Sequence, residues 1–137
     1  MPAEISYADE PQLAAAEFID LLRRSTLAER RPVDDPVRIV RMLEEADIIL
    51  CARDHAGLLV GVSRAITDFS YCCYLSDLAV DMARQRGGIG RELIRLTHER
   101  AGEETMLILL AAPKVLGYYP HIGMDHSDRA FTLDRRR

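Results

Sequence analysis

Hydrophobic and polar residues recur along the chain with two different periods, which predicts both strands and helices. Apolar and polar residues alternate over residues 5–8, a pattern typical of a short strand. Apolar residues then recur at roughly helical spacing and predict a helix near residues 10–24, with Asp9 as its N-cap. Pro36 is placed to open a second helix, because a proline at the first helical position lacks only an N–H that has no partner there. The chain therefore begins with a strand and two helices.

From Asp47 onward, β-branched, aromatic and other apolar residues predict a series of strands. The predicted elements are a buried strand at 48–52, a hairpin turn at 54–57, a strand at 58–67 with Gly61 as a bulge, and a central strand at 71–80.

The last third of the chain returns to mixed helix and strand. The predicted elements are an amphipathic helix at 89–101, a strand at 106–111, a short helix at 114–119 that ends at Pro120, and a last strand at 130–133. The run at 106–111 is continuously apolar, as expected of a strand buried on both faces. Strands interspersed with helices in this order predict a layered α/β or α+β fold.

Composition and charge narrow the class of protein. The chain has 137 residues, of which 48% are hydrophobic and 29% charged, so we expect a single ordered domain over residues 1–137. The net charge of −4 argues against general nucleic-acid binding. No apolar run reaches the roughly 20 residues of a membrane helix, and Met1–Glu4 lacks the layout of a signal peptide. We therefore expect a cytoplasmic protein with no membrane partner.

The three cysteines, Cys51, Cys72 and Cys73, do not form a metal-ligand pattern. No Cys-x-x-Cys or Cys/His spacing is present, so we expect no metal site. Free cysteines behave most often as small buried apolar residues. A thiol-based redox role for Cys72 and Cys73 is an alternative with no supporting motif.

The segment Gln85–Gly90 is the most informative indication of function in the sequence. Glycines remove side chains from a turn that leads into a helix, so successive backbone N–H groups can converge on an anion at the helix N-terminus. The segment matches neither the GxxxxGK[ST] loop of nucleotide triphosphatases nor the three-glycine dinucleotide fingerprint. A simple tight turn would need one glycine only and would leave Gly90 unexplained.

The context of that loop resembles the GNAT superfamily of N-acyltransferases. Leu75–Val80, followed by Gln85-x-x-Gly88-x-Gly90 and an amphipathic helix, resembles the family's acyl-CoA signature. Tyr118–Met124 resembles its aromatic-Tyr-x-x-apolar-Gly-aromatic segment, with Met124 in place of the usual Phe. The resemblance implies a GNAT-like mixed, mostly antiparallel sheet flanked by helices, and it extends over nearly the whole chain.

The resemblance also implies an activity: transfer of an acetyl group from acetyl-CoA to a primary amine by direct attack in a ternary complex, without a metal. Two strands of the family splay apart and hold the pantetheine arm between them, which here would be residues 71–80 and 106–111. The acceptor would be a small-molecule or protein amine. The residues that the resemblance assigns to the acyl-CoA are Leu78, Ala79, Val80, Gln85, Arg86, Gly87, Gly88, Ile89, Gly90 and Arg91.

Two residues are expected to act on protons. Tyr119 matches the family's general-acid tyrosine, which protonates the leaving thiolate. Asp77 is the candidate base for the amine, although it could instead fix the acceptor or bond to the backbone. The alternative function is a non-catalytic acyl-CoA-binding regulatory module on the same fold, and the homodimer common in the family is allowed for this chain.

Overall fold

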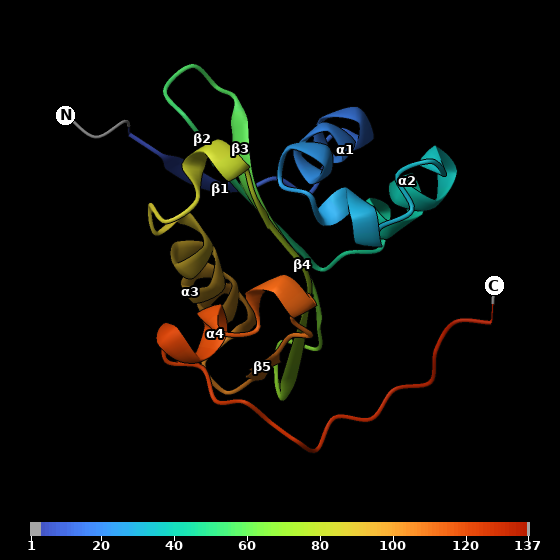
Figure 1. The fold of residues 1–137 in the computed structure, drawn as a ribbon, viewed down its shortest axis with the longest axis vertical. Coiled ribbons are helices and arrows are strands. Elements are labelled where there is room, and N and C mark those ends of the chain that lie inside the picture. The colour runs from blue at the N-terminus through green and yellow to red at the C-terminus, as the bar shows by residue number, and fades with distance from the viewer. Residues whose placement is uncertain (1–3, 137) are drawn as a thin grey trace.

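The computed structural model describes residues 4–136 and shows a five-stranded sheet flanked by helices (Figure 1). Residues 1–3, which belong to the segment expected to lack a signal peptide, lie outside the described residues, and so does Arg137. The strands are β1 (Ser6–Asp9), β2 (Ile48–Arg53), β3 (Leu59–Thr67), β4 (Cys72–Val80) and β5 (Met106–Ile108), and they lie in that order in the sheet. Neighbouring strands are antiparallel except for β4 and β5, which are parallel. This mostly antiparallel mixed sheet confirms the predicted fold class.

Helices and turns alternate with these strands. The helices are α1 (Ala15–Arg24), α2 (Pro36–Glu44), α3 (Ile89–Ala101) and α4 (Tyr118–His121). Three 3₁₀ turns connect them: η1 (Leu27–Arg30), η2 (Met82–Arg84) and η3 (Pro113–Val115). Asp35 caps α2 by accepting a hydrogen bond from the Arg38 N–H, and Pro36 begins the helix as predicted.

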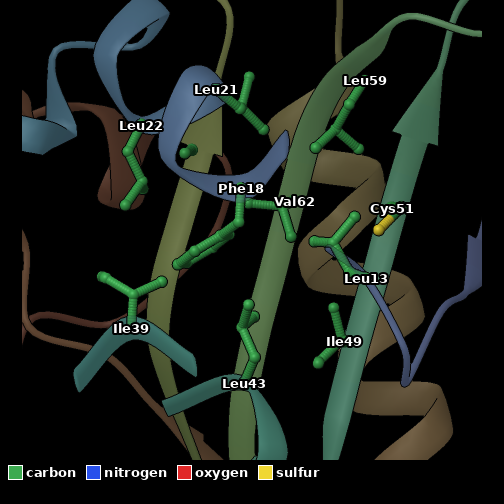
Figure 2. Packing of buried hydrophobic residues seen from close by; sticks show 11 residues of the cluster. Leu13, Phe18, Leu21, Leu22, Ile39, Leu43, Ile49, Cys51, Leu59 and Val62 are labelled. Atoms are coloured by element: carbon green, nitrogen blue, oxygen red, sulfur yellow. The ribbon is translucent and has the colours of Figure 1, made fainter. Parts of the chain in front are cut away.

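Helices α1 and α2 cover one face of the sheet. Phe18 and Leu22 of α1 and Ile39 of α2 are fully buried against side chains of β2 and β3, such as Val62 (Figure 2). The side chains come from one stripe of each helix, because residues three or four apart share a helical face. This cluster contains more buried residues than the hydrophobic cluster on the other face of the sheet.

Helix α3 covers the opposite face. Ile89 and Leu93 pack on the sheet, and Gly61 of β3 lies directly beneath them. A Cβ at Gly61 would come within 2.8 Å of Ile89 Cγ2, so glycine is required for this close approach. The buried Ser63 and Thr97 hydroxyls are 2.6 Å apart and join the same two elements.

The sheet contains two irregularities in register. The pairing of β2 with β3 shifts next to Gly61, where the sequence predicted a bulge. The pairing of β3 with β4 also shifts, since Arg64 lies opposite Asp77 whereas the next residue, Ala65, lies opposite Leu75. Ser76 of β4 therefore has no partner on β3 and forms a bulge. A bulge increases local twist and turns a strand away from its neighbour. The second bulge, which the sequence did not reveal, lies where β4 and β5 part.

Two predicted helix boundaries are wrong. Helix α1 begins at Ala15 rather than near residue 10, and Asp9 belongs to β1, where its carboxylate binds the Arg100 guanidinium instead of capping a helix. Helix α4 continues through Pro120, which the sequence placed at its end. Pro120 is the third residue of that helix, where a backbone N–H has no intrahelical acceptor to lose.

The C-terminal strands also differ from the prediction. Strand β5 ends at Ile108 rather than at residue 111, and it is an edge strand with Met106 and Ile108 exposed, so it is not buried on both faces. Residues 130–133 form no strand in the described chain, and Phe131 and Leu133 are fully exposed. An apolar, β-branched pattern is not sufficient for a strand, because a strand needs a hydrogen-bonded neighbour and a surface to pack on.

Candidate active site

The site begins at an open edge of β4. Strand β5 pairs only with residues 72–74, so β4 continues for six further residues, Leu75–Val80, past the end of its neighbour. The Asp81 N–H donates to the Val60 carbonyl on β3, at 2.9 Å. Because main-chain groups of a strand point alternately to either side, the N–H and C=O groups of Leu78 and Val80 face the open edge. An extended ligand could pair with them as an additional strand would.

The glycine-rich loop follows directly at the end of that edge. Arg86 and Gly88 have positive φ values, 72° and 86°, and Gly88 is the N-cap of α3. The backbone N–H groups of residues 85–88 donate no hydrogen bond within the described part of the chain. Such unpaired donors at the positive end of a helix of 13 residues favour an anion. The Gln85 side chain folds back onto the Val80 carbonyl, at 3.2 Å, and joins the loop to the strand.

An ion pair anchors the start of the loop. Asp81 accepts a hydrogen bond from Arg24 Nη1 at 2.5 Å, and Arg24 Nη2 donates to the Leu59 carbonyl at 2.8 Å. The second Asp81 oxygen accepts from the Ala83 N–H and caps η2. The chain between β4 and the loop is therefore held against α1 and β3, which fixes where the loop begins.

A shallow pocket lies beside the first turn of α3. Its volume is about 420 Å³, and its lining includes Gly88 and Arg91 from the loop and α3 and Ile122 and Met124 after α4. The lining thus combines charged side chains, which also include Glu92 and Arg95, with apolar ones. The pocket lies directly beside the glycine-rich loop.

A buried cluster of charged side chains surrounds Asp77 of β4. Asp77 is completely buried, and each of its carboxylate oxygens accepts a hydrogen bond from a different guanidinium, Arg31 Nε and Arg64 Nε. Arg31 Nη2 also donates to the Ser76 carbonyl at 2.8 Å, and Arg64 Nη2 to the Ser76 hydroxyl at 3.0 Å. The cluster thus attaches the segment after η1 to the bulge of β4.

Two adjacent tyrosines lie on α4, and one of them contacts the first turn of α3. Their rings meet edge to face, with centroids 5.2 Å apart. The Tyr118 hydroxyl lies 3.2 Å from the position that a Cβ on Gly90 would take, so it occupies the space that this glycine leaves. Burial raises the pKa of both hydroxyls above the usual 10.0, an effect that Arg91 partly opposes at Tyr118. Tyr119 is half-buried, and its hydroxyl makes no hydrogen bond within the described residues, so it is protonated at neutral pH and free to donate.

Comparison with known proteins identifies the family. The sequence model of the acetyltransferase (GNAT) family matches residues 15–123, which include every element from α1 to α4. The chain belongs to the GNAT acetyltransferase family. This confirms the resemblance drawn from the loop and from Tyr118–Met124.

Solved GNAT structures share the fold at low sequence identity. An acetyltransferase of the GNAT family from Streptococcus pneumoniae aligns over 98% of this chain and 100% of its own, with a TM-score of 0.73 and 18% identity. An aminoglycoside N-acetyltransferase in complex with CoA aligns over 100% and 98%, with a TM-score of 0.75 and 14% identity. An acetyltransferase from Trypanosoma brucei aligns over 96% and 100%, with a TM-score of 0.68 and 20% identity. No protein of curated function matches the chain.

The structure brings most of the predicted GNAT site residues together. Leu78–Val80 and Gln85–Arg91 follow one another from the open edge to the N-terminus of α3, and the Tyr118 hydroxyl lies beside Gly90. Tyr119 contacts Tyr118. The neighbouring Arg84 points away to the β2–β3 turn and pairs with Asp54 at 3.4 Å. Asp77 lies on the same strand, but its carboxylate is enclosed by guanidinium groups rather than exposed to the path.

Sequence reasoning missed Arg31 and Arg64. Each contacts Asp77 from a different element, one 46 residues and the other 13 residues away in the chain. In the sequence Arg31 precedes Pro32, a pattern that indicates only a loop. An arginine within the apolar strand 59–67 was the available signal for Arg64, because a charge in a buried strand requires a partner.

The remaining predictions concern the cysteines, metal ligands and membrane-spanning helices. Burial raises the pKa of the Cys51 thiol to about 12 and also raises that of Cys73, so neither favours redox chemistry as a thiolate. Across residues 4–136, no three His, Cys, Asp or Glu side chains are grouped so that they could hold a metal ion. No helix in that range is long and apolar enough to cross a membrane.

Proposed function

We propose that this GNAT protein transfers an acetyl group from acetyl-CoA to a primary amine by direct attack in a ternary complex. The observation that carries the proposal is the continuous path from the open edge of β4 to the unpaired N–H groups before α3. Family membership supports acyl transfer, and the fold is shared with an aminoglycoside N-acetyltransferase in complex with CoA. The acceptor of that neighbour is not transferred to this chain.

The residues present fit an acyl-CoA. The alternating main-chain groups of Leu78 and Val80 would pair with the amides of the pantetheine arm. The N–H groups of residues 85–88 and the positive end of α3 would bind the pyrophosphate. Arg86 and Arg91 are exposed at the loop and would meet further phosphate charge. When bound, acetyl-CoA supplies an activated thioester, and the chain orients it.

Tyr119 is proposed as the proton donor to the leaving thiolate. Its hydroxyl is protonated because burial raises its pKa, and no described residue competes for its proton. A general acid must carry its proton at the working pH, and Tyr119 does so, although the raised pKa also makes its hydroxyl a weaker acid. The neighbouring Tyr118 lies over Gly90 and is proposed to shape the loop rather than to transfer a proton.

Asp77 is proposed to position the acceptor side of the site. The alternative that it is the base remains a prediction, and its contacts give that role little room. Both carboxylate oxygens already accept hydrogen bonds from guanidinium groups, and the carboxylate is completely buried. With Asp77 engaged in this way, a water relay is the proposed route for the amine's proton.

The test is acetyl-CoA turnover, followed by release of free thiol across a panel of primary amines. We expect turnover on at least one amine class, and Tyr119→Phe should lower kcat about 10²-fold while CoA affinity is unchanged. Gly88→Glu should abolish CoA binding, because it places a negative side chain at a residue with positive φ in the anion site. Gly117→Ala is the matched control, since nothing lies within 4 Å of its Cβ position.

Three outcomes would contradict the proposal or one of its assignments. Tight CoA binding without turnover on any amine would support the regulatory, non-catalytic module instead. Unchanged CoA affinity in Gly88→Glu would remove the loop from the site. Loss of CoA affinity in Tyr119→Phe, with kcat preserved, would make Tyr119 a packing residue.

A further inference from the structure

The cluster around Asp77 holds one more positive charge than negative charge. The Asp77 carboxylate pairs with both Arg31 and Arg64, and neither guanidinium contacts a second carboxylate among the ion pairs of the described residues. The Asp77 side chain is fully buried, and the side chains of Arg31 and Arg64 are only 21% and 9% exposed. Because a buried charge without a counter-ion is costly, this excess favours a ligand that carries a negative charge.

Arg31 is the member of the cluster with donors to spare. Its three guanidinium nitrogens donate one hydrogen bond each, to the Asp77 carboxylate, the Arg30 carbonyl and the Ser76 carbonyl. A guanidinium has five N–H groups, so two of those on Arg31 have no acceptor within the described part of the chain. One is on Nη1 and the other on Nη2, the nitrogens through which an arginine can bind the two oxygens of a carboxylate.

An open apolar surface begins beside this cluster. Three residues that neighbour one another in the register of the sheet form it, and we call them the apolar strip: Ile66, Tyr74 and Ile108. Each of the three is 40–44% exposed. Ile66 follows Arg64 by two residues on β3, so the two side chains lie on one face of the sheet, about 7 Å apart. Positive charge and exposed apolar surface therefore lie next to each other.

The proposed position of acyl-CoA brings the acetyl group to the same place. With its pyrophosphate at residues 85–88, the pantetheine arm would run back along the β4 edge past Val80 and Leu78, so the thioester would come toward the bulge at Ser76. The Ser76 carbonyl accepts a hydrogen bond from Arg31 Nη2 at 2.8 Å. An amine at the bulge and a carboxylate at Arg31 would therefore be close together, as they are on the α-carbon of an amino acid.

We propose that the acceptor is a free α-amino acid with an apolar side chain, an inference that rests on the proposed function. The two spare N–H groups of Arg31 bind its carboxylate, and its side chain lies on the apolar strip. Its neutral amine attacks the thioester, so that a C–N bond forms and the C–S bond breaks. The amine's proton leaves through the water relay, and Tyr119 protonates the CoA thiolate. A polycationic amine would instead bring further positive charge to Arg31.

The first experiment compares L-leucine with L-leucinamide as acceptors, at saturating acetyl-CoA. The two differ in the carboxylate, and the amide also represents the N-terminus of a peptide. With kcat/KM expressed per neutral amine, we expect leucine to exceed leucinamide at least about 10-fold, because the amide forfeits charge-assisted hydrogen bonds. Glycine, which leaves the apolar strip uncovered, should also be at least about 10-fold poorer than leucine.

The second experiment assigns the preference to Arg31. Arg31→Met should reduce the ratio of kcat/KM between leucine and leucinamide to about one, whereas Arg31→Lys should keep part of it because the charge remains. Arg30→Met is the matched control, since it removes the neighbouring exposed guanidinium and should leave the ratio as it is. Circular dichroism checks that each variant is folded. A purely structural role of Arg31 would lower both rates by one factor and preserve the ratio.

The possible failures are distinguishable. If leucinamide or a polycationic amine is acetylated as well as leucine, the acceptor assignment is overturned, whereas acetyl transfer to an amine stands. A ratio that survives in a folded Arg31→Met variant also overturns the assignment. If the protein binds CoA but turns over acetyl-CoA with no amine, the proposed function fails and the acceptor assignment fails with it.

Discussion

The two halves of the sheet contain similar apolar residues but are covered differently. Phe18 and Ile39 pack on the β2–β3 half and are fully buried, and α3 seals its other face. In the β5 half, Met106 is 60% exposed and Ile108 44% exposed. Apolar character therefore indicates that a residue could be buried, whereas the layers around it decide whether it is. The half that stays open is also the half that carries the path to the glycine-rich loop.

The largest expected difference comes from truncating one side chain in each half. Phe18→Ala should lower the free energy of unfolding by about 3–5 kcal/mol, because it leaves a cavity among fully buried side chains. Ile108→Ala should cost less than about 1 kcal/mol, because this side chain is already 44% exposed. Urea denaturation followed by circular dichroism measures both. Equal losses would show that the β5 half is as well packed as the other.

The next largest loss of stability is expected from the charge cluster around Asp77, which lies between the two halves. Arg64→Met leaves the buried Asp77 carboxylate with one guanidinium and should lower the free energy of unfolding by about 3 kcal/mol. Arg95→Met is the matched control, because the acid partners of Arg95 lie in solvent along α3 and the loss should stay below about 0.5 kcal/mol. A loss for Arg64→Met no larger than for Arg95→Met would mean that the cluster contributes little to the boundary.

The close contact of α3 with the covered half gives a smaller effect. Gly61→Ala should destabilise the protein by about 1–2 kcal/mol, since its Cβ would lie 2.8 Å from Ile89 Cγ2 and 3.2 Å from Ala52 Cβ. Gly117→Ala, where nothing lies within 4 Å, should be neutral or slightly stabilising. Thermal unfolding of the two variants compares them. A neutral Gly61→Ala would show that α3 shifts freely on the sheet.

The smallest effect concerns pH at the hairpin between β3 and β4. The Asp68 carboxylate accepts hydrogen bonds from the N–H groups of Ser70, Tyr71 and Cys72, which lower its pKa from 3.8 to about 2. A lowered pKa means that the stabilisation is complete above the usual value and is lost as the pH falls through about 2. Unfolding measured from pH 5 downward should therefore show a shallower acid loss in Asp68→Asn, whose amide oxygen accepts at any pH. An unchanged slope would exclude Asp68 as a contributor.

Much of the fold and of the donor side of the site could be predicted from local pattern. The strand 48–53 is a continuous apolar run and the helix 89–101 is amphipathic, and both are found at, or within a residue of, the predicted bounds. The loop before α3 is recognisable because its glycines are adjacent in sequence. By contrast, the enclosure of Asp77 by Arg31 and Arg64 depends on two contacts between separate elements, and no spacing in the sequence encodes them.

The sequence by itself therefore determined the order of the elements as far as α4, the family and the glycine-rich loop before α3, since each depends on residues close together in the chain. Only the tertiary structure decided that β5 stops after three residues, that β4 keeps an open edge, and that residues 130–133 find no neighbour. The physical reason is that helices satisfy their main-chain hydrogen bonds locally, whereas a strand exists only when a distant segment pairs with it. Residues with strand propensity are able to pair, but the tertiary structure determines which of them are paired.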